Sequence, residues 1–211
     1  MDIHIRPESQ EDYFENENVT REAFWNLYVP GCVEHYLVHL LRDHKDYLPE
    51  FSYVAVHEDK IIGNIFYAKS HLINEKDEKL DTLTFGPVSV LPEFQRKGVG
   101  SALIQHTVAI AKQRKFPGII IYGYPANYCK HGFKNAKDYQ ISTADGKFPY
   151  SMLVLELEKD IFKSHTWKYY DSKVYDIKES DATEFDKKFL PKKKEYCYTQ
   201  DIFSIAVRAS L

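Results

Sequence analysis

The chain has few cysteines and no long apolar run. Among its 211 residues, Cys32, Cys129 and Cys197 are the only cysteines, and they are widely separated. An odd number without a CxxC pair argues against a disulfide framework and favours free thiols in a reducing compartment. No apolar stretch approaches the ~20 residues that a membrane helix needs, and the first residues lack the pattern of a signal peptide. We therefore expect a cytoplasmic protein that does not enter a membrane.

A strong charge of one sign is also lacking. Lys and Arg total 28 against 31 Asp and Glu, which gives a net charge of -3. With no basic field over the whole molecule, a nucleic-acid partner would need a local patch. Residues 187–194 contain five lysines, but such short runs are usually solvated surface. We expect no nucleic-acid partner; an adaptor using this run would bind polyanions with strong salt dependence.

Bulky core material is abundant. The chain contains 16 tyrosines, 13 phenylalanines and 2 tryptophans, and 44% of its residues are hydrophobic. A chain of this length can bury most of its apolar surface without metals or disulfides. No internal repeat is present, and the composition becomes aromatic and lysine-rich after about Glu158. We expect a domain over residues 1–158 and an extension, 159–211, packed on the same domain.

Hydrophobic periodicity predicts alternating strands and helices. The expected strands cover residues 3–6, 51–57, 61–68, 82–91, 118–124 and 150–157, with a further strand allowed at 202–207. The expected helices lie within residues 8–27, 33–41, 99–115 and 125–131. The strand at 82–91 contains Gly86-Pro87, and proline cannot donate a ladder hydrogen bond. Its pairing should therefore be bulged, splayed or at an edge.

One loop has the features of a phosphate-binding site. A strand is followed by Gln95-Arg96-Lys97-Gly98-Val99-Gly100 and then by the clearest helix pattern of the chain, which has a broad apolar stripe. Glycines let the backbone approach an anion, and the free amides and dipole of a helix N-terminus favour negative charge. The loop is neither a Walker A motif nor a dinucleotide fingerprint, because Leu103 stands where the latter needs its third glycine.

Two motifs at the correct separation resemble a known family. The Q/R-x-x-G-x-G/A pattern after a strand ending in V-x-P resembles the pyrophosphate loop of the GNAT superfamily of acyl-CoA N-acyltransferases. Tyr128-x-x-x-Gly132-Phe133 is similar to the family's Tyr-x-x-x-Gly-Phe motif in the short helix after the next strand. The resemblance covers roughly residues 1–158. It is strongest to predicted bacterial N-acetyltransferases.

The resemblance implies a fold and a co-substrate. The fold would be α/β (α+β), with a mixed, mostly antiparallel central sheet flanked by helices, splayed between its fourth and fifth strands and followed by a C-terminal extension. In this family the pantetheine arm of acetyl-CoA adds to the open strand edge by backbone hydrogen bonds. The residues implied to bind acetyl-CoA are Val88, Ser89, Val90, Gln95, Arg96, Lys97, Gly98, Val99, Gly100, Ser101 and Asn127.

The family motif also implies a catalytic role for Tyr128. A phenol with a pKa near ~10 is protonated at pH 7 and can share its proton with a departing thiolate. A core tyrosine is the other interpretation. A nucleophilic Cys129 would imply a ping-pong route, whereas the family generally transfers the acyl group directly.

The proton acceptor for the amine stays open at this stage. No carboxylate lies in residues 82–91, where some relatives place one, and Thr84 and Phe85 occupy that segment. The remaining candidates are His71, Glu34, His131 or a water chain.

A metal centre is a separate alternative that the spacing of two histidines raises. His35, His39 and Asp43 share one helix face, but the HExxH signature is absent, and such spacing is common by chance in a chain with 9 histidines. We expect no metal.

The expected activity is acetyl-CoA-dependent N-acetylation of a primary amine on a small molecule or peptide, by direct transfer. A non-catalytic acyl-CoA-binding regulatory module is the alternative, and it predicts binding without turnover. The acceptor pocket would be built from the helices around residues 28–44 and the hairpin, with the tail as a further candidate, and the aromatics there hint at an apolar or planar acceptor. The extension caps that pocket, completes the sheet or forms a homodimer contact, and composition does not separate these.

Overall fold

The computed structural model describes all residues, 1–211, and contains one central sheet of 9 strands. The strands are β1 His4–Pro7, β2 Tyr53–His57, β3 Lys60–Asn74, β4 Lys79–Val90, β5 Gly118–Tyr122, β6 Lys134–Asn135, β7 Ile141–Thr143, β8 Met152–Glu156 and β9 Trp167–Tyr170. The main order is β1-β2-β3-β4-β5-β8-β6, and β9 joins β3 to β7. Only the pairs β4–β5 and β7–β9 are parallel, so the predicted mixed, mostly antiparallel sheet is confirmed.

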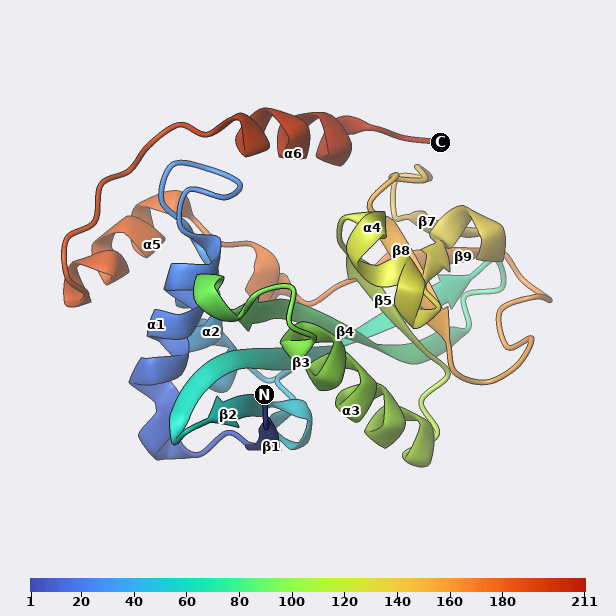
Figure 1. Cartoon of the computed structure of the whole chain (residues 1–211). Coiled ribbons are helices and arrows are strands. Elements are labelled where there is room, and N and C mark those ends of the chain that lie inside the picture. Colours follow the sequence, from blue (N-terminus) through green and yellow to red (C-terminus); the bar gives the residue numbers. More distant parts are fainter.

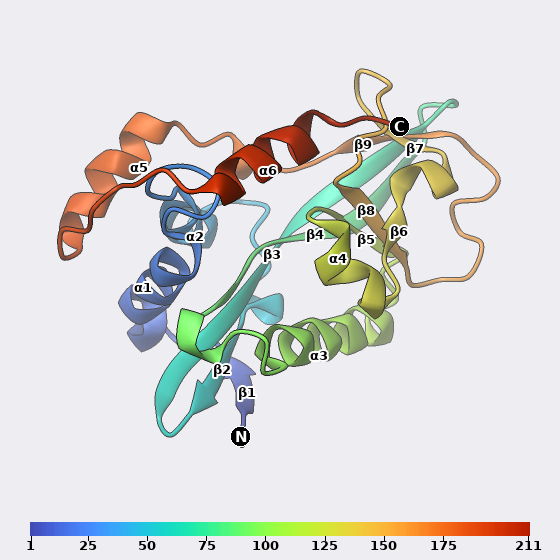
Figure 2. The same cartoon turned by 45° about the horizontal axis from the view of Figure 1, so that its top comes forward.

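Helices cover both faces of the sheet (Figures 1 and 2). They are α1 Tyr13–Phe24, α2 Glu34–Arg42, α3 Val99–Gln113, α4 Pro125–Tyr128, α5 Glu179–Phe185 and α6 Tyr198–Arg208. The side chain of Asn64 in β3 bonds to α1 through Thr20, whereas Tyr67 bonds to Thr107 of α3. Because alternate strand residues point to opposite faces, α1 and α3 lie on opposite sides.

Strand β3 extends through the whole core. Its residues belong to all three apolar clusters of the molecule: Tyr67 to the cluster under α3, Leu72 to the cluster near β9, and Phe66 to the cluster under α2. The predicted hairpin with β2 is confirmed, and Glu58 and Asp59 form its turn with φ of 48° and 60°. Two consecutive positive φ values suit the right-handed twist of a tight hairpin.

Strand β4 is bulged where the sequence contains Gly86-Pro87. Ile65 of β3 pairs with Val88 and Tyr67 pairs with Phe85, so Phe66 alone faces two residues of β4. Beyond the single parallel pair Leu83–Ile119, β4 and β5 have no further register partners. The predicted bulge is confirmed, and the two strands separate toward the C-terminal end of β4.

A buried ion cluster joins the first two helices. The Arg42 side chain, 5% exposed, donates to Glu8 Oε1 at 2.7 Å and to Glu17 Oε1 at 2.6 Å. Both carboxylates are buried as well, at 3% and 7% exposure. Tyr47 donates to the other oxygen of Glu8 at 3.3 Å. One guanidinium therefore compensates two buried carboxylates.

The carboxylate of Asp12 forms a separate ion pair near the start of the chain. Asp12 accepts two hydrogen bonds from Arg6, at 2.6 and 2.8 Å, and two from the amide and hydroxyl of Ser9. These donors stabilise the ionised carboxylate and hold the pKa of Asp12 at about 2 instead of 3.8. The ionised form is thus favoured in the folded chain.

We expect Asp12→Asn to lower the free energy of unfolding by about 2 kcal/mol at pH 7. A folded-state pKa below the unfolded one stabilises the protein fully above pH ~4, and this contribution is lost as the pH falls through about 2. The difference between variant and wild type in urea unfolding should therefore shrink between pH 5 and pH 2. Glu11→Gln, at the exposed neighbouring carboxylate, is the control. A pH-independent difference for Asp12→Asn would contradict this account.

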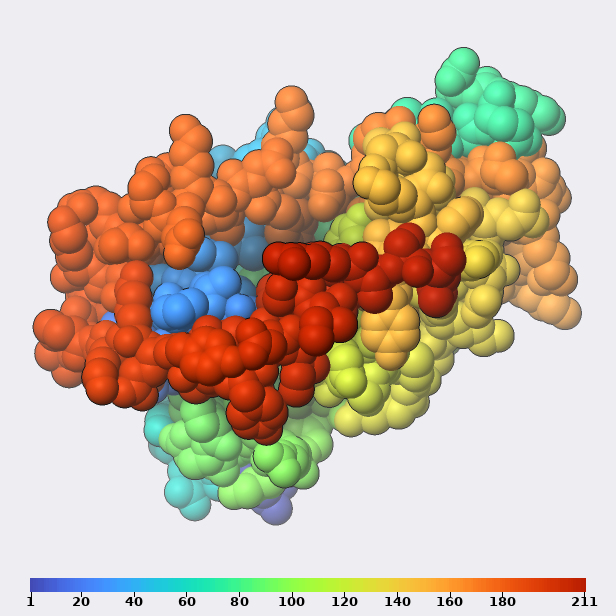
Figure 3. Space-filling model, turned by 90° about the horizontal axis from the view of Figure 1, so that it is seen from above, coloured from blue at the N-terminus to red at the C-terminus, as the bar shows by residue number.

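Of the three roles considered for the extension after Glu158, completion of the sheet is confirmed, whereas capping of the acceptor pocket stays a prediction. Strand β9 pairs with β3 and β7, which completes the sheet. Helix α6 crosses one face of the molecule (Figure 3) and is tied down where Thr199 Oγ1 donates to the Leu27 carbonyl at 3.0 Å. A homodimer contact stays a prediction.

The strand allowed at residues 202–207 is wrong, because these residues lie inside α6. Thr199, Ile202, Phe203 and Ala206 recur at helical spacing and line the same cavity. A strand there would need a ladder partner, whereas the helix satisfies its backbone internally.

None of the helices is sufficiently long and apolar to span a bilayer.

Candidate functional site

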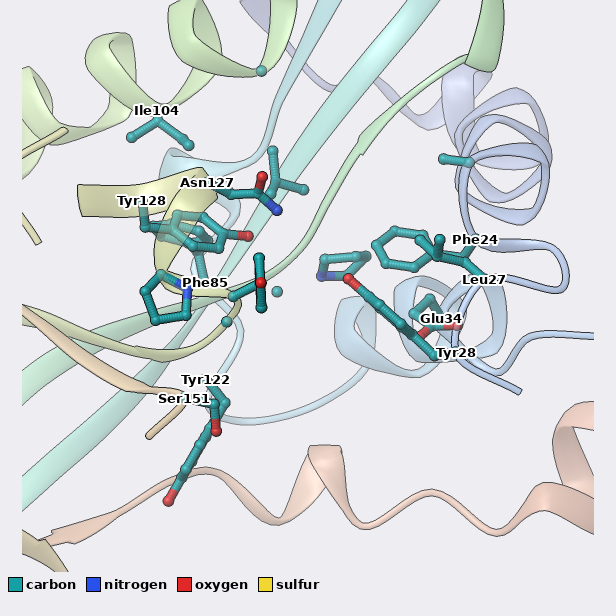
Figure 4. Close-up of a pocket in the computed structure, with 18 of the residues that line it drawn as sticks. Phe24, Leu27, Tyr28, Glu34, Phe85, Ile104, Tyr122, Asn127, Tyr128 and Ser151 are labelled. Carbon is teal, nitrogen blue, oxygen red and sulfur yellow. The ribbon is translucent and has the colours of Figure 1, made fainter. Parts of the chain in front are cut away.

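A large cavity opens where β4 and β5 separate. Its volume is about 1160 Å³, and its walls come from the N-terminus of α3, the short helix α4, the end of α1, the start of α2 and the overlying α6. Figure 4 shows Tyr128 and Asn127 on one wall and Tyr28, Phe24 and Glu34 on the other. The cavity therefore has two facing halves.

The first half contains the predicted phosphate loop. Gly98 precedes α3 with φ of 90°, and Arg96 also has a left-handed backbone, with φ of 58°. A Cβ on Gly98 would meet no atom within 4 Å, so its positive φ, and not crowding, favours glycine here. The Gln95 side chain donates to the Val90 carbonyl at 3.0 Å and ties the loop to the end of β4.

The N-terminus of α3 has no side-chain cap. The first amides of a helix have no intrahelical partner, and without a side-chain cap those of α3 are available to an anion. Arg96 lies at the same end of the cavity and adds a full positive charge. The loop can bind a phosphate or pyrophosphate group.

Most of the predicted site residues come together in this cavity. Those that line it are Val88, Val90, Gln95, Arg96, Gly98, Val99, Gly100, Ser101, Asn127 and Tyr128. Two do not. The Ser89 side chain is buried on the α1 side and donates to Thr20 Oγ1 at 3.1 Å, and Lys97 extends over the Phe94 ring, 5.5 Å from its centre.

The separated edge of β4 supplies main-chain groups to the cavity. The lining includes Gly86, Pro87 and Val88, which lie beyond the last pairing with β5. An unpaired strand edge presents N–H and C=O groups that an extended ligand can bind as an added strand. The bulge and the splay together create this edge.

Tyr128 is held by packing around its ring. Phe85 and Phe133 contact it with ring centres 5.9 Å away, and a Cβ on Gly123 would collide with it. Burial, with a smaller contribution from the facing Tyr28, raises the pKa of the Tyr128 phenol above its usual value. The hydroxyl therefore stays protonated near neutral pH and has a proton to donate.

The facing wall carries a carboxylate among aromatic rings. Glu34 begins α2, and its carboxylate accepts the Val33 amide at 3.0 Å. Burial raises the pKa of Glu34. Beside it, the Tyr28 ring stacks on Phe203 of α6 with centres 4.3 Å apart. Helix α6 thus forms part of this half of the cavity.

Of the predicted proton acceptors, the structure places two at the cavity and one away from it. Glu34 and His131 line the cavity. His131 Nε2 lies 3.4 Å from Ser101 Oγ, on the phosphate-loop side, and burial lowers its pKa. His71 does not line the cavity, and its ring stacks on Tyr170 at 5.2 Å.

Two alternative chemistries considered from the sequence have no support from the positions of their residues. Cys129 is exposed and does not line the cavity. His35 instead contacts Cys32 Sγ at 3.3 Å and Asp186 at 3.1 Å, while His39 pairs with Glu17. No group of three or more His, Cys, Asp or Glu side chains is arranged to hold a metal ion.

Sequence reasoning considered the extension as a cap over the site but named none of the residues that it contributes. Tyr169, Asp171 and Tyr175 line the cavity next to β9, and the Tyr175 hydroxyl donates to the Gly86 carbonyl at 3.5 Å. Burial raises the pKa of Asp171. Only the aromatic composition of this segment hinted at such a role.

Comparisons with known proteins agree with this geometry. The model of the Acetyltransferase (GNAT) family matches residues 21–133. The uncharacterized N-acetyltransferase YjhQ of Escherichia coli K12 is 29% identical over 98 residues, which are 46% of this chain and 54% of YjhQ. The match thus spans about half the length of that relative.

Solved structures share the fold. The GNAT family N-acetyltransferase YhbS from Escherichia coli, in complex with CoA, superposes with a TM-score of 0.71 at 18% identity, covering 83% of this chain and 92% of YhbS. A GNAT family acetyltransferase from Brucella melitensis, in complex with acetyl-CoA, gives 0.64 at 24% identity, covering 82% and 98%.

Proposed function

Since this chain belongs to the GNAT acetyltransferase family, we propose that it transfers an acetyl group from acetyl-CoA directly to a primary amine of a small molecule or peptide. The observation that carries the proposal is one continuous cavity. It joins an uncapped helix N-terminus with Arg96, an unpaired strand edge and a protonated tyrosine. Each of these suits a different part of acyl transfer from a long anionic thioester.

The first half of the cavity fits acetyl-CoA. The amides of residues 96–101 and the Arg96 guanidinium would hold the pyrophosphate. Main-chain groups of residues 86–90 would hold the pantetheine arm as an added strand. Acetyl-CoA supplies an activated thioester, and the protein supplies binding and orientation.

Tyr128 supplies the proton for the leaving group. As the amine nitrogen forms the new C–N bond, the C–S bond breaks and the sulfur departs with its electron pair. The Tyr128 hydroxyl donates a proton to this thiolate, which yields a free thiol. The amine must lose a proton as well, and Glu34 and His131 are the acceptors that line the cavity.

Calorimetric titration with acetyl-CoA tests the binding half of the proposal before any acceptor is known. We expect binding by the wild type, and an affinity lowered about tenfold or more in the Arg96→Ala, Lys97→Ala double variant, because two charges beside the loop are lost. Dephospho-CoA keeps the pyrophosphate but lacks the 3′-phosphate, so its affinity shows how much the 3′-phosphate contributes to binding. Lys112→Ala with Lys159→Ala is the matched control, since both lysines are exposed and lie outside the cavity lining.

A folded wild type that binds neither acetyl-CoA nor longer acyl-CoAs would overturn the proposal. Binding without thiol release on any amine would instead favour the regulatory module. Thiol release with a panel of amines, measured on the same preparation, separates these outcomes.

A further inference from the structure

The charged residues of the cavity are divided between its walls. The basic ones, Arg96, Lys130 and His131, belong to the phosphate loop and to the turn that follows α4. The acidic ones, Glu34 and Asp171, belong to α2 and to the extension. An anionic ligand is therefore attracted toward Arg96 and Lys130, and a cationic ligand toward Glu34.

Glu34 has no cationic partner within the protein. Its only hydrogen-bond donor from another residue is the Val33 amide, and no lysine, arginine or histidine pairs with it. This contrasts with the buried carboxylates Glu8 and Glu17, both of which pair with Arg42. Glu34 is partly exposed in the cavity, and a carboxylate in such an apolar site without a cation would be stabilised by a bound ammonium group.

Aromatic rings surround this carboxylate. Tyr28 lies between Phe203, at 4.3 Å, and Phe24, at 5.7 Å between ring centres. Leu27 and Leu37 complete the apolar lining nearby. Aromatic faces attract cations and also bury flat or branched apolar groups. The wall therefore suits an ammonium group attached to an apolar body.

We propose that the acceptor is a cationic amine on an aromatic or branched apolar body without a carboxylate beside the amine, and that Glu34 selects it. This inference rests on the proposed acetyl transfer and names the acceptor class for the same site. A carboxylate next to the amine would face Glu34 and, further along the cavity, Asp171. Like-charge contact of this kind discriminates against amino acids without any change in the apolar fit.

Matched pairs of amines test the selection. 2-Phenylethylamine and phenylalanine share one body and differ by a carboxylate, as do 3-methylbutylamine and leucine. In both pairs we expect the wild type to prefer the amine that lacks the carboxylate. Its affinity for that amine and its rate of acetylation should each be higher by about tenfold or more. Glu34→Gln should reduce this preference to about threefold or less. Binding is measured by calorimetry on protein saturated with CoA, and turnover by thiol release.

Two controls separate charge selection from a structural effect. Glutamine keeps an oxygen that accepts the Val33 amide, so acetyl-CoA affinity of Glu34→Gln should match the wild type, and its thermal stability should be no lower than that of the wild type, because an uncompensated charge is removed. Glu58→Gln, at a side chain that is 87% exposed in the hairpin turn, should retain the full preference.

Equal binding of both members of each pair, an unchanged preference in Glu34→Gln, or no binding of either amine would overturn the inference. Acetylation of other acceptors would then leave the proposed function intact. Conversely, selective amine binding in a protein that binds no acyl-CoA would remove the proposed function and leave the cationic site.

Discussion

Replacing Tyr128 with phenylalanine is expected to lower kcat by about 10²- to 10⁴-fold, the usual contribution of a positioned general acid. Phenylalanine keeps the ring that Phe85 and Phe133 contact, so only the hydroxyl is lost. Acetyl-CoA affinity should therefore stay within about threefold of the wild type. Steady-state thiol release and calorimetric titration measure the two quantities separately.

The pH dependence of kcat in the wild type is a second test of the same assignment. Because burial raises the pKa of Tyr128 above its usual value near 10, the donor is fully protonated between pH 6 and 9. Any ionisation seen in kcat over that range must come from another group. Tyr139→Phe, outside the cavity, is the matched control. An unchanged kcat in Tyr128→Phe would remove Tyr128 from the mechanism, and a loss confined to Cys129→Ala would favour the thiol route.

The second large effect concerns stability. Arg42→Met should lower the free energy of unfolding by about 3–5 kcal/mol, the cost of leaving buried charges without their partner. Methionine keeps an apolar stem near the Tyr13 ring, over which the guanidinium carbon lies at 3.9 Å. What is lost is the cation that compensates Glu8 and Glu17. Urea unfolding followed by circular dichroism measures the change.

Two companion variants identify the cause. Adding Glu8→Gln and Glu17→Gln to Arg42→Met should restore part of the loss, because neutral amides leave no buried charge. Arg114→Met breaks an exposed pair with Glu50 and should cost less than about 1 kcal/mol. If Arg42→Met costs as little as Arg114→Met, the cluster is not the source of stability that its burial indicates.

Sequence reasoning succeeded where the signal is local. The phosphate loop combines a strand end, positive-φ residues and a helix start within a few consecutive residues, and the structure places most of the named residues in one cavity. The bulge at Gly86-Pro87 follows from the missing amide of a single proline. A splay was one of the three outcomes that this proline allowed, and the family resemblance added which two strands it separates.

It failed where the structure depends on distant contacts. Residues 202–207 form a short apolar run, and such a run fits a strand or a helix until its neighbours are known. Strand β9 is short and pairs with a strand about a hundred residues earlier, so nothing in its own sequence marks it. Among the named residues, the Ser89 side chain points to the α1 side of the sheet and Lys97 does not line the cavity, since strand alternation and side-chain packing decide direction.

The long strand β3 also has a consequence for the order of assembly. Its pairings with β2 and β4 close short loops, whereas its pairing with β9 closes one of about a hundred residues. The meander β2-β3-β4 can therefore form early, and the extension can dock on it late. Part of the wall that faces the phosphate loop, including Phe203 and Asp171, comes from this extension, whereas the phosphate loop follows directly from the meander. Partial detachment of the extension would open the acceptor side to solvent while the loop kept its shape.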